Sequence, residues 1–241
     1  MMRELFLEQN NKTKALVLCS SGLDSVYNLL KAKQEFTSVS VAFFDYSQKA
    51  VAQEYVHVRK LCQALKLDFI KVDLPWYRNL DSSLLSKKTE ISKYASLKDA
   101  DSSSTLPEWV PNRNGVFVNI GAAIAESKSY QVIIMGLNKE EAVRFPDNTE
   151  TFMNRSNSLF EFSTLSKPKV FSYSVDMVKN DIYDELCKTA DLLGIKNIQE
   201  YIWSCYDSYE KMCGSCESCL RLKRVIKEHR QESEWKDRFL R

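Results

Sequence analysis

Glycine, proline and histidine are scarce in this chain, and each shortage excludes a class of protein. The 241 residues include six glycines and five prolines, which excludes collagenous, linker-like and low-complexity architectures. The two histidines, His57 and His229, argue against a histidine-rich metal site and against a catalytic triad. No apolar run approaches the roughly 20 residues of a membrane-spanning helix. Residues 1–13 are charged and lack the apolar centre of a signal peptide, so we expect a cytoplasmic protein without a membrane partner.

Neither sign of charge dominates. Lysines and arginines number 34 against 32 aspartates and glutamates, a formal net charge of +2. This balance does not demand a strongly electrostatic partner, so no nucleic acid is required. The hydrophobic share of 44% is ordinary for a globular chain and suffices for one large core, alone or with a small appendage.

Strand and helix patterns alternate along the chain. Short apolar runs, typical of strands buried on both faces, precede segments with apolar residues at helical spacing. The predicted strands are 15–19, 38–44, 68–74, 131–136 and 169–172, and the predicted helices are 25–33, 50–66, 114–128, 151–162 and 177–193. This order predicts an α/β fold, a doubly wound parallel sheet with helices on both faces. Ligands bind beyond the carboxyl ends of such strands, which here lead into loops 20–25, 45–49 and 137–149.

A loop of small residues follows the first predicted strand. It reads Ser20-Ser21-Gly22-Leu23-Asp24-Ser25. Small side chains let the backbone approach a ligand closely, and the N–H groups at the start of the next helix attract an anion. Asp24 would repel a phosphate and is better explained as a Mg²⁺ ligand. The loop suits the pyrophosphate of a nucleotide with its metal; the alternative is a tight turn before a helix capped by Asp24 or Ser25.

Four of the seven cysteines gather near the C-terminus. They are Cys205, Cys213, Cys216 and Cys219, with seven, two and two residues between them. In a cytosolic chain such a cluster is a metal site before it is a pair of disulfides. Four thiolates close a tetrahedral Zn²⁺ site that has no place for water, so the site is structural. An iron–sulfur cluster and a redox-active dithiol are the alternatives.

Basic residues follow the cluster. They are Arg221, Lys223, Arg224 and Lys227. A zinc-ribbon module that binds nucleic acid would use them, and a solvated helix face explains them equally well.

Several stretches of the sequence resemble one enzyme family. Residues 20–25 resemble the Ser-Gly-Gly-x-Asp-Ser signature of the N-type ATP pyrophosphatases, which cleave ATP to AMP and pyrophosphate. Residues 44–49, Phe-Asp-Tyr-Ser-Gln-Lys, resemble the Phe-Asp-Tyr-Gly-Gln-Arg stretch of the 7-cyano-7-deazaguanine synthase family of the queuosine pathway. Residues 110–114, Val-Pro-Asn-Arg-Asn, and the cysteines within 203–219 resemble two further motifs of that family. The resemblance covers about residues 15–222.

The resemblance implies a fold, a reaction and cofactors. It implies an adenine nucleotide alpha hydrolase-like fold, with a PP-loop ATP pyrophosphatase domain over 12–174 and a helical zinc-binding region over 175–241. Family members convert 7-carboxy-7-deazaguanine, ammonia and ATP into the nitrile by way of the amide. The carboxylate is adenylated, ammonia displaces AMP, and a second adenylation permits dehydration. We therefore expect a ligase with ATP, Mg²⁺ and Zn²⁺ as cofactors, a deazaguanine-like substrate, ammonia, and a homodimer.

The resemblance also implies roles for residues. Asp24 would hold Mg²⁺ and Arg113 would stabilise charge, which makes both catalytic. The residues expected at ATP are Ser20, Ser21, Gly22, Leu23, Asp24, Ser25, Phe44 and Gln48. Those expected at the substrate are Gly136, Asn138, Phe145 and Asp147, with Phe145 stacking on the heterocycle and Asp147 accepting hydrogen bonds. The metal ligands are Cys205, Cys213, Cys216 and Cys219.

The match weakens at positions that face the substrate. The family reads Gly-Val-Asn and then Asp-Tyr-Ser-Gly-Tyr-Pro-Asp-Cys-Arg, where residues 136–149 here read Gly-Leu-Asn-Lys-Glu-Glu-Ala-Val-Arg-Phe-Pro-Asp-Asn-Thr. The Gly-x-Asn and aromatic-Pro-Asp elements survive, and the other elements do not. Ser21 also replaces the first glycine of the signature, and Ala50 replaces a histidine. The charges of Glu140, Glu141 and Arg144 suggest a pocket with altered charge or a wider mouth.

Three functions stay open at this point. The favoured one is a nitrile synthase of this family. A relative could instead stop at the amide or join the activated deazaguanine to another amine. A zinc-ribbon protein that binds a nucleotide or RNA without this catalysis is the candidate from another class. A tRNA-thiolating ATP pyrophosphatase is disfavoured, because all four clustered cysteines are committed to a metal.

Overall fold

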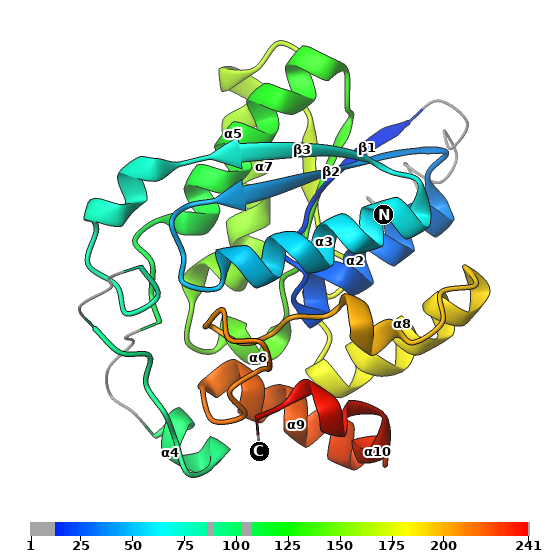
Figure 1. The fold of residues 1–241 in the computed structure, drawn as a ribbon. Helices are drawn as coiled ribbons and strands as arrows, with labels where there is room; N and C mark the ends of the chain where they lie inside the picture. Colours follow the sequence, from blue (N-terminus) through cyan, green and yellow to red (C-terminus); the bar gives the residue numbers. More distant parts are fainter. Residues whose placement is uncertain (1–12, 86–88, 103–107, 241) are drawn as a thin grey trace.

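Five parallel strands form one sheet in the order β3-β2-β1-β4-β5 (Figure 1). The computed structural model describes residues 13–85, 89–102 and 108–240. The strands are β1 (Lys14–Leu18), β2 (Ser38–Asp45), β3 (Asp68–Asp73), β4 (Val132–Met135) and β5 (Lys169–Phe171). The order reverses between β1 and β4, which are neighbours although β2 and β3 come between them in the chain.

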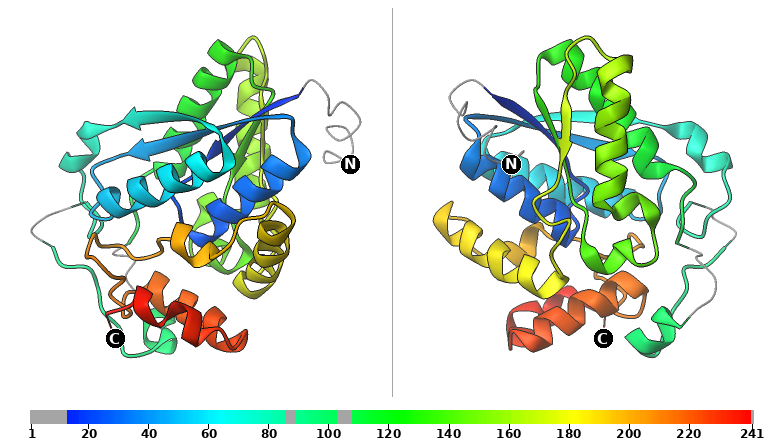
Figure 2. Two further views of the ribbon diagram at one scale, coloured as in Figure 1. Left: turned by 45° about the vertical axis from the view of Figure 1, so that its right-hand side comes forward. Right: turned by 180° about the vertical axis from the view of Figure 1, so that it is seen from behind.

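Helices cover both faces of the sheet (Figures 1 and 2). One face carries α2 (Leu23–Glu35), α3 (Val51–Leu65) and α8 (Lys179–Leu192), and the other carries α5 (Arg113–Lys128) and α7 (Glu150–Ser163). The central strand shows why both are needed, because Ala15 and Val17 enter one core while Leu16 and Leu18 enter the other. A strand that is apolar on both faces must be covered on both. The predicted doubly wound α/β sheet is confirmed.

Shorter helices occupy the loops and the C-terminal region. They are α4 (Leu97–Asp101), α6 (Lys139–Ala142), α9 (Glu217–Glu228) and α10 (Glu232–Trp235), with 3-10 turns at Pro75–Asn79, Pro146–Asn148, Ile198–Tyr201 and Lys236–Arg238. All five predicted strands and all five predicted helices are present within about two residues of their predicted bounds. In the part of the chain that the structure describes, no helix is long and apolar enough to cross a membrane.

The start of α2 differs from one of the two interpretations of its loop. Gly22 is the N-cap and no side chain caps the helix, while the Ser25 hydroxyl donates to the Gly22 carbonyl at 2.9 Å. A helix capped by Asp24 or Ser25 is therefore wrong. The side chains that a cap would have used are turned to other partners.

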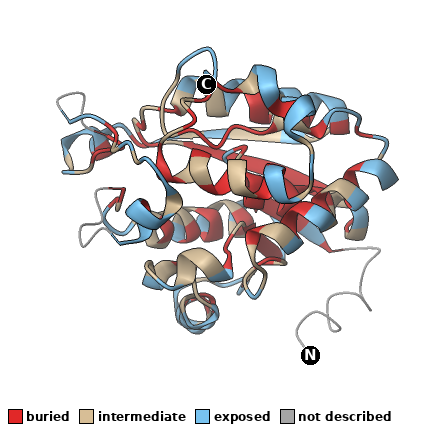
Figure 3. Cartoon of the chain, turned by 90° about the horizontal axis from the view of Figure 1, so that it is seen from below, coloured by how far each residue is buried: buried red, intermediate tan, exposed pale blue. Residues whose placement is uncertain are grey.

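The C-terminal region packs onto the sheet rather than standing apart. Helix α8 lies against α2, and Trp203, Cys216 and Trp235 belong to the same hydrophobic core as β1 and α2. Figure 3 shows buried residues continuing from the sheet into the helices around it. The division at residues 174 and 175 stays a prediction.

Candidate active site

A cavity of about 220 Å³ opens at the carboxyl ends of β1, β2 and β4. Leu18, Phe44 and Met135 line it from the ends of these strands. The cavity thus lies where the strand order reverses, between β1 and β4. Connections that leave neighbouring strands in opposite directions open a crevice there, which is where open α/β sheets bind ligands. The loops predicted at 20–25 and 137–149 both reach it.

The small-residue loop lies against the cavity. Ser20, Gly22, Leu23, Asp24 and Ser25 line it, and the N-terminus of α2 follows directly. Gly136 lines the same cavity at the end of β4, and a Cβ there would lie 2.6 Å from the backbone nitrogen of Ser25. Glycine is therefore required at position 136 for β4 to approach the loop this closely. The N–H groups of the first turn of α2 provide a place for an anion.

Ser21 adopts a backbone conformation unusual for an L-residue. Its φ is +66°, in the left-handed region that glycine favours. The side chain is fully buried, and its Oγ has no hydrogen-bond partner within the described residues. The Ser21 carbonyl accepts from the Trp203 N–H at 2.9 Å, so the C-terminal region fixes the loop.

Asp24 is held in a buried polar cluster. Its Oδ2 accepts from Lys179 Nζ at 2.8 Å and from Asn138 Nδ2 at 2.9 Å. Lys179 Nζ also lies 2.9 Å from Glu141 Oε1, so one cation joins two carboxylates. Burial raises the pKa of Asp24, and Lys179 opposes that rise. Burial acts against the Lys179 ammonium too, but the two carboxylates outweigh it and raise its pKa.

Lys179 is a site residue that the sequence analysis missed. It lines the cavity and is 6% exposed. It occupies the first residue of α8, where the helix dipole disfavours a cation. A lysine at the predicted start of a helix was therefore a weak signal that a carboxylate from another part of the chain lies beside it.

The loop after β2 contributes Phe44, and Gln48 supports it from behind. Phe44 lines the cavity and stacks on Phe117 with ring centroids 4.2 Å apart. Gln48 Nε2 donates to the Phe44 carbonyl at 3.0 Å and to Glu54 Oε2 at 2.8 Å. Glu54 lines the cavity, and burial raises its pKa to about 7. Glu54 was not predicted as a site residue from the sequence.

Arg113 enters the cavity from the start of α5. Its guanidinium lies 5.9 Å from the centre of the Tyr46 ring, and Nη1 is 3.5 Å from the Tyr46 hydroxyl. Burial disfavours the charge of Arg113, but Tyr46 and Asp147 outweigh burial and raise its pKa. Arg113 is therefore a permanent cation in the cavity, as expected of a residue that stabilises phosphate or carboxylate charge.

The predicted substrate residues divide into two groups. Phe145 and Asp147 line the cavity with Gly136. Asn138 is fully buried behind it, with Nδ2 on Asp24 and Oδ1 accepting from the Glu141 N–H at 2.9 Å. Asn138 thus supports Asp24, and Ser21 and Gln48 likewise stand behind the described lining of the cavity.

The charges that distinguish the loop after β4 are paired within the protein. Glu140 accepts from Arg224 Nη2 at 2.7 and 2.9 Å, and Glu141 pairs with Lys179. Arg144 Nη1 lies 3.4 Å from Glu217 Oε1. These contacts tie α6 and the residues after it to α8 and α9. These charged residues therefore fix the loop after β4 against α8 and α9.

The four clustered cysteines come together as predicted. Their Sγ atoms all lie within 4.8 Å of one another, and those of Cys213 and Cys219 are 3.9 Å apart. Zinc–thiolate bonds of about 2.3 Å in a tetrahedron place the sulfurs about 3.8 Å apart, so the spacing fits such a site. Gly214 takes the turn inside the cluster with φ +76°.

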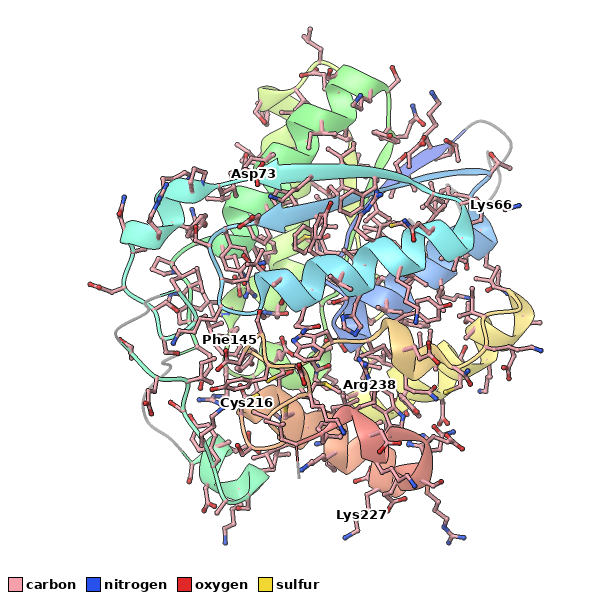
Figure 4. The ribbon with its side chains drawn as sticks, viewed as in Figure 1. Lys66, Asp73, Phe145, Cys216, Lys227 and Arg238 are labelled. Carbon is pink, nitrogen blue, oxygen red and sulfur yellow. The ribbon has the colours of Figure 1, made fainter. Side chains whose placement is uncertain are left out.

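The cysteine region also forms one wall of the cavity. Trp203, Ser204, Tyr206 and Ser218 line it. Figure 4 labels Phe145 and Cys216, one from the loop after β4 and one from the cysteine cluster. Of the basic residues after the cluster, Arg221 pairs with Glu217 at 2.8 Å and Lys223 lies over the Phe239 ring. These side chains serve internal contacts, which favours a packed helix over a nucleic-acid surface. The sequence signalled the metal cluster but not its contribution to the cavity.

The switch-point cavity, the small-residue loop at a helix start and the four-cysteine cluster define an α/β protein with a ligand crevice at the carboxyl edge of a parallel sheet. The family model for "Queuosine biosynthesis protein QueC" matches residues 14–229, and the chain belongs to that family. A relative named 7-cyano-7-deazaguanine synthase from Carboxydothermus hydrogenoformans is 40% identical over 218 residues, 88% of this chain and 97% of the relative. One of the same name from Pelotomaculum thermopropionicum is 37% identical over 219 residues, 89% and 96% of the two chains. The resemblance found in the sequence is confirmed.

Among solved structures, the U34-tRNA thiolase NcsA from Methanococcus maripaludis with its [4Fe-4S] cluster is similar with a TM-score of 0.46 and 12% identity. The similarity covers 94% of this chain and 70% of the thiolase.

Proposed function

We propose that this chain is an ATP-dependent carbon–nitrogen ligase that converts 7-carboxy-7-deazaguanine and ammonia into 7-cyano-7-deazaguanine. Family membership supports the reaction, and one observation carries the ATP chemistry. Asp24 Oδ1 is buried at the start of α2 and has no hydrogen-bond partner in the described part of the chain. A buried carboxylate oxygen requires a donor or a cation. Mg²⁺ bridging to a pyrophosphate group would supply it.

The residues around the cavity suit adenylation. Ser20, Ser25 and the N-terminus of α2 would hold the β- and γ-phosphates, and Mg²⁺ on Asp24 would offset the charge of the departing pyrophosphate. A carboxylate oxygen of the substrate would attack the α-phosphorus and displace pyrophosphate. Arg113 would neutralise charge on the reacting phosphate or carboxylate, and Lys179 would keep Asp24 ionised and in place.

The later steps need a nitrogen nucleophile and a proton acceptor. Ammonia would attack the acyl-adenylate, and AMP and a proton would leave. A second ATP would then adenylate the amide oxygen and release pyrophosphate, and loss of AMP with that oxygen and of the two amide protons would give the nitrile. Glu54 lines the cavity with a pKa of about 7, which suits a group that takes up a proton near neutral pH. The Phe44–Phe117 pair and Tyr46 provide the apolar surroundings that exclude water from an acyl-adenylate.

The cysteine cluster would hold a structural zinc ion. Four thiolates leave no open coordination position, and the metal would fix the segment that carries Trp203 and Tyr206 into the cavity. The cytoplasmic location and the homodimer stay predictions from the sequence.

The bond that breaks in ATP tests the proposal. We expect ATP labelled at the α-phosphate to give AMP, with pyrophosphate released, only when 7-carboxy-7-deazaguanine is present. Reactions without the acid, and with guanine in its place, are the controls. ADP as the product would contradict the proposed function. No cleavage with the acid would also contradict it and would leave the nucleotide-binding protein without this catalysis.

A further inference from the structure

One buried carboxylate in the cavity has no role in the ATP chemistry. Glu108 lines the cavity and is 5% exposed. Its Oε1 accepts from the Tyr94 hydroxyl at 3.2 Å, and its Oε2 has no hydrogen-bond partner in the ranges that the structure describes. Burial raises the pKa of Glu108. A buried carboxylate oxygen left without a donor is costly, which points to a ligand that brings one.

The next residue in the chain, Trp109, stacks on another ring that lines the cavity. The rings of Trp109 and Phe145 are nearly parallel, with an angle of 9° between their planes and centroids 5.9 Å apart. Both rings line the cavity and both are only partly buried. Tyr206 from the cysteine region lines the cavity as well. A stacked, partly buried ring pair offers an outer face on which a planar heterocycle can stack.

We propose that Glu108 determines specificity by reading the donor edge of the heterocycle. Its carboxylate accepts hydrogen bonds from a ring N–H and an adjacent amino group, while the ring system stacks on Trp109 and Phe145. Two neighbouring N–H donors match two carboxylate oxygens, as in the paired contacts between guanidinium and carboxylate groups. The inference rests on the proposed function, because that function supplies a guanine-like ring with this edge.

Asp24 is assigned to Mg²⁺ and Glu54 accepts from Gln48, and three further acidic side chains near the cavity are engaged within the protein. Asp147 Oδ1 accepts from Asn148 Nδ2 at 3.2 Å, and the charge of Arg113 acts on this carboxylate. Glu217 is paired with Arg221 at 2.8 Å and with Arg144 at 3.4 Å. Glu141 is paired with Lys179. Glu108 is therefore the carboxylate whose geometry best suits the edge of a neutral ring.

The test measures discrimination between two ligands. Binding of 7-carboxy-7-deazaguanine and of 7-carboxy-7-deazahypoxanthine, which lacks the amino group, is measured by calorimetry in the intact zinc-loaded protein. We expect the wild type to prefer the amino compound by about 10- to 100-fold, as for hydrogen bonds to a charged acceptor. Glu108→Gln, which keeps the shape and replaces one acceptor by a donor, should reduce that preference to about threefold or less.

Two further variants complete the design. Glu90→Gln alters an exposed glutamate that precedes Glu108 in the chain, and it should keep the preference for the amino compound. Tyr94→Phe removes the hydroxyl that holds Glu108 Oε1, so it should lower the preference in part, and it serves if Glu108→Gln does not fold. Unchanged ATP binding and metal content verify that each variant is intact.

The outcomes separate the two proposals. Loss of the preference in Glu108→Gln supports the specificity role. If the wild type binds the amino compound and Glu108→Gln keeps the full preference, or weakens both ligands equally, the role of Glu108 is overturned and the proposed function stands. If the wild type binds neither ligand, both are overturned.

Discussion

Ser21 shows at the scale of one residue how the C-terminal region fixes the loop at residues 20–25. Its φ of +66° is costly for a residue with a Cβ, and its buried hydroxyl has no described partner. The hydrogen bond from the Trp203 N–H to the Ser21 carbonyl holds the loop in this shape. The sequence revealed the substitution of a glycine, but not that the backbone keeps the glycine conformation.

Ser21→Gly should therefore stabilise the protein. Relief of the left-handed strain and loss of an unpaired buried hydroxyl outweigh the extra freedom of glycine in the unfolded chain. We expect the free energy of unfolding to rise by about 1 kcal/mol and the melting temperature by about 2–4 °C. Ser20→Gly, at a neighbour without positive φ, is the matched control and should bring no gain. Equal effects of the two variants would contradict the strain.

Asp24→Ala should abolish turnover. The change removes the free Oδ1 proposed to hold Mg²⁺, so the charge of departing pyrophosphate is left uncompensated. Lys179 keeps its pair with Glu141, so the fold should persist. We expect the rate of pyrophosphate release to fall by about 1,000-fold or more, with a retained circular dichroism spectrum. A variant that keeps a tenth or more of the rate would exclude this role for Asp24.

Glu54 should make stability depend on pH. Its carboxyl binds a proton more tightly in the folded protein, where its pKa is about 7, than in the unfolded chain, where the ordinary value is 4.5. The folded state is therefore favoured below pH 4.5 and loses stability as the pH rises from there to 7. Glu54→Gln should not lose this stability, because a glutamine side chain does not ionise.

Denaturant unfolding across that pH range provides the measurement. The free energy of unfolding of Glu54→Gln should rise relative to that of the wild type as the pH rises, and the difference should become constant above pH 7. We expect a total change of about 2 kcal/mol, which allows for screening by water in the cavity. Glu90→Gln, at an exposed position, should show a flat difference. A flat difference for Glu54→Gln would mean that the carboxyl is not held protonated.

At the scale of elements, the sequence predicted what local patterns encode. Strands such as β1 and β4 are continuous apolar runs, and α3 repeats apolar residues at helical spacing, so both types were located from their own residues. The motifs that predicted the loop at 20–25 and Arg113 as site residues are likewise local stretches of the sequence. What could not be predicted is pairing between elements. Lys179 meets Asp24 across 155 residues, and a lysine at the start of α8 signals a partner without identifying it.

The cysteine element should bind zinc and lose it together with its fold. Cys216→Ser removes one of four thiolates, and metal binding in such sites is coupled to folding. We expect about one equivalent of zinc in the wild type, less than half in the variant, and a lower melting temperature. Cys187→Ser, a partly buried cysteine on α8, is the control and should keep the metal. Iron in place of zinc, or wild-type protein without metal, would contradict the assignment.

At the scale of the whole molecule, segments from both ends of the chain enclose one cavity. The cavity is lined by the loop after β1, by residues 108–110, by the loop after β4 and by Trp203, Ser204 and Tyr206. Sequence motifs identified the first and third of these as ligand sites. Glu108 and Trp203 were missed because their place in the cavity depends on how distant segments pack, which no single-segment pattern records.

The nature of the product tests the central claim most directly. The protein is incubated with ATP, ¹⁵N-labelled ammonia and 7-carboxy-7-deazaguanine, and the product is examined by mass spectrometry. We expect one labelled nitrogen and a mass equal to acid plus ammonia minus two water molecules, the nitrile, with two AMP formed for each product molecule. A product that stops at the loss of one water, a conjugate with another amine, or unchanged acid would contradict the assignment as a nitrile synthase.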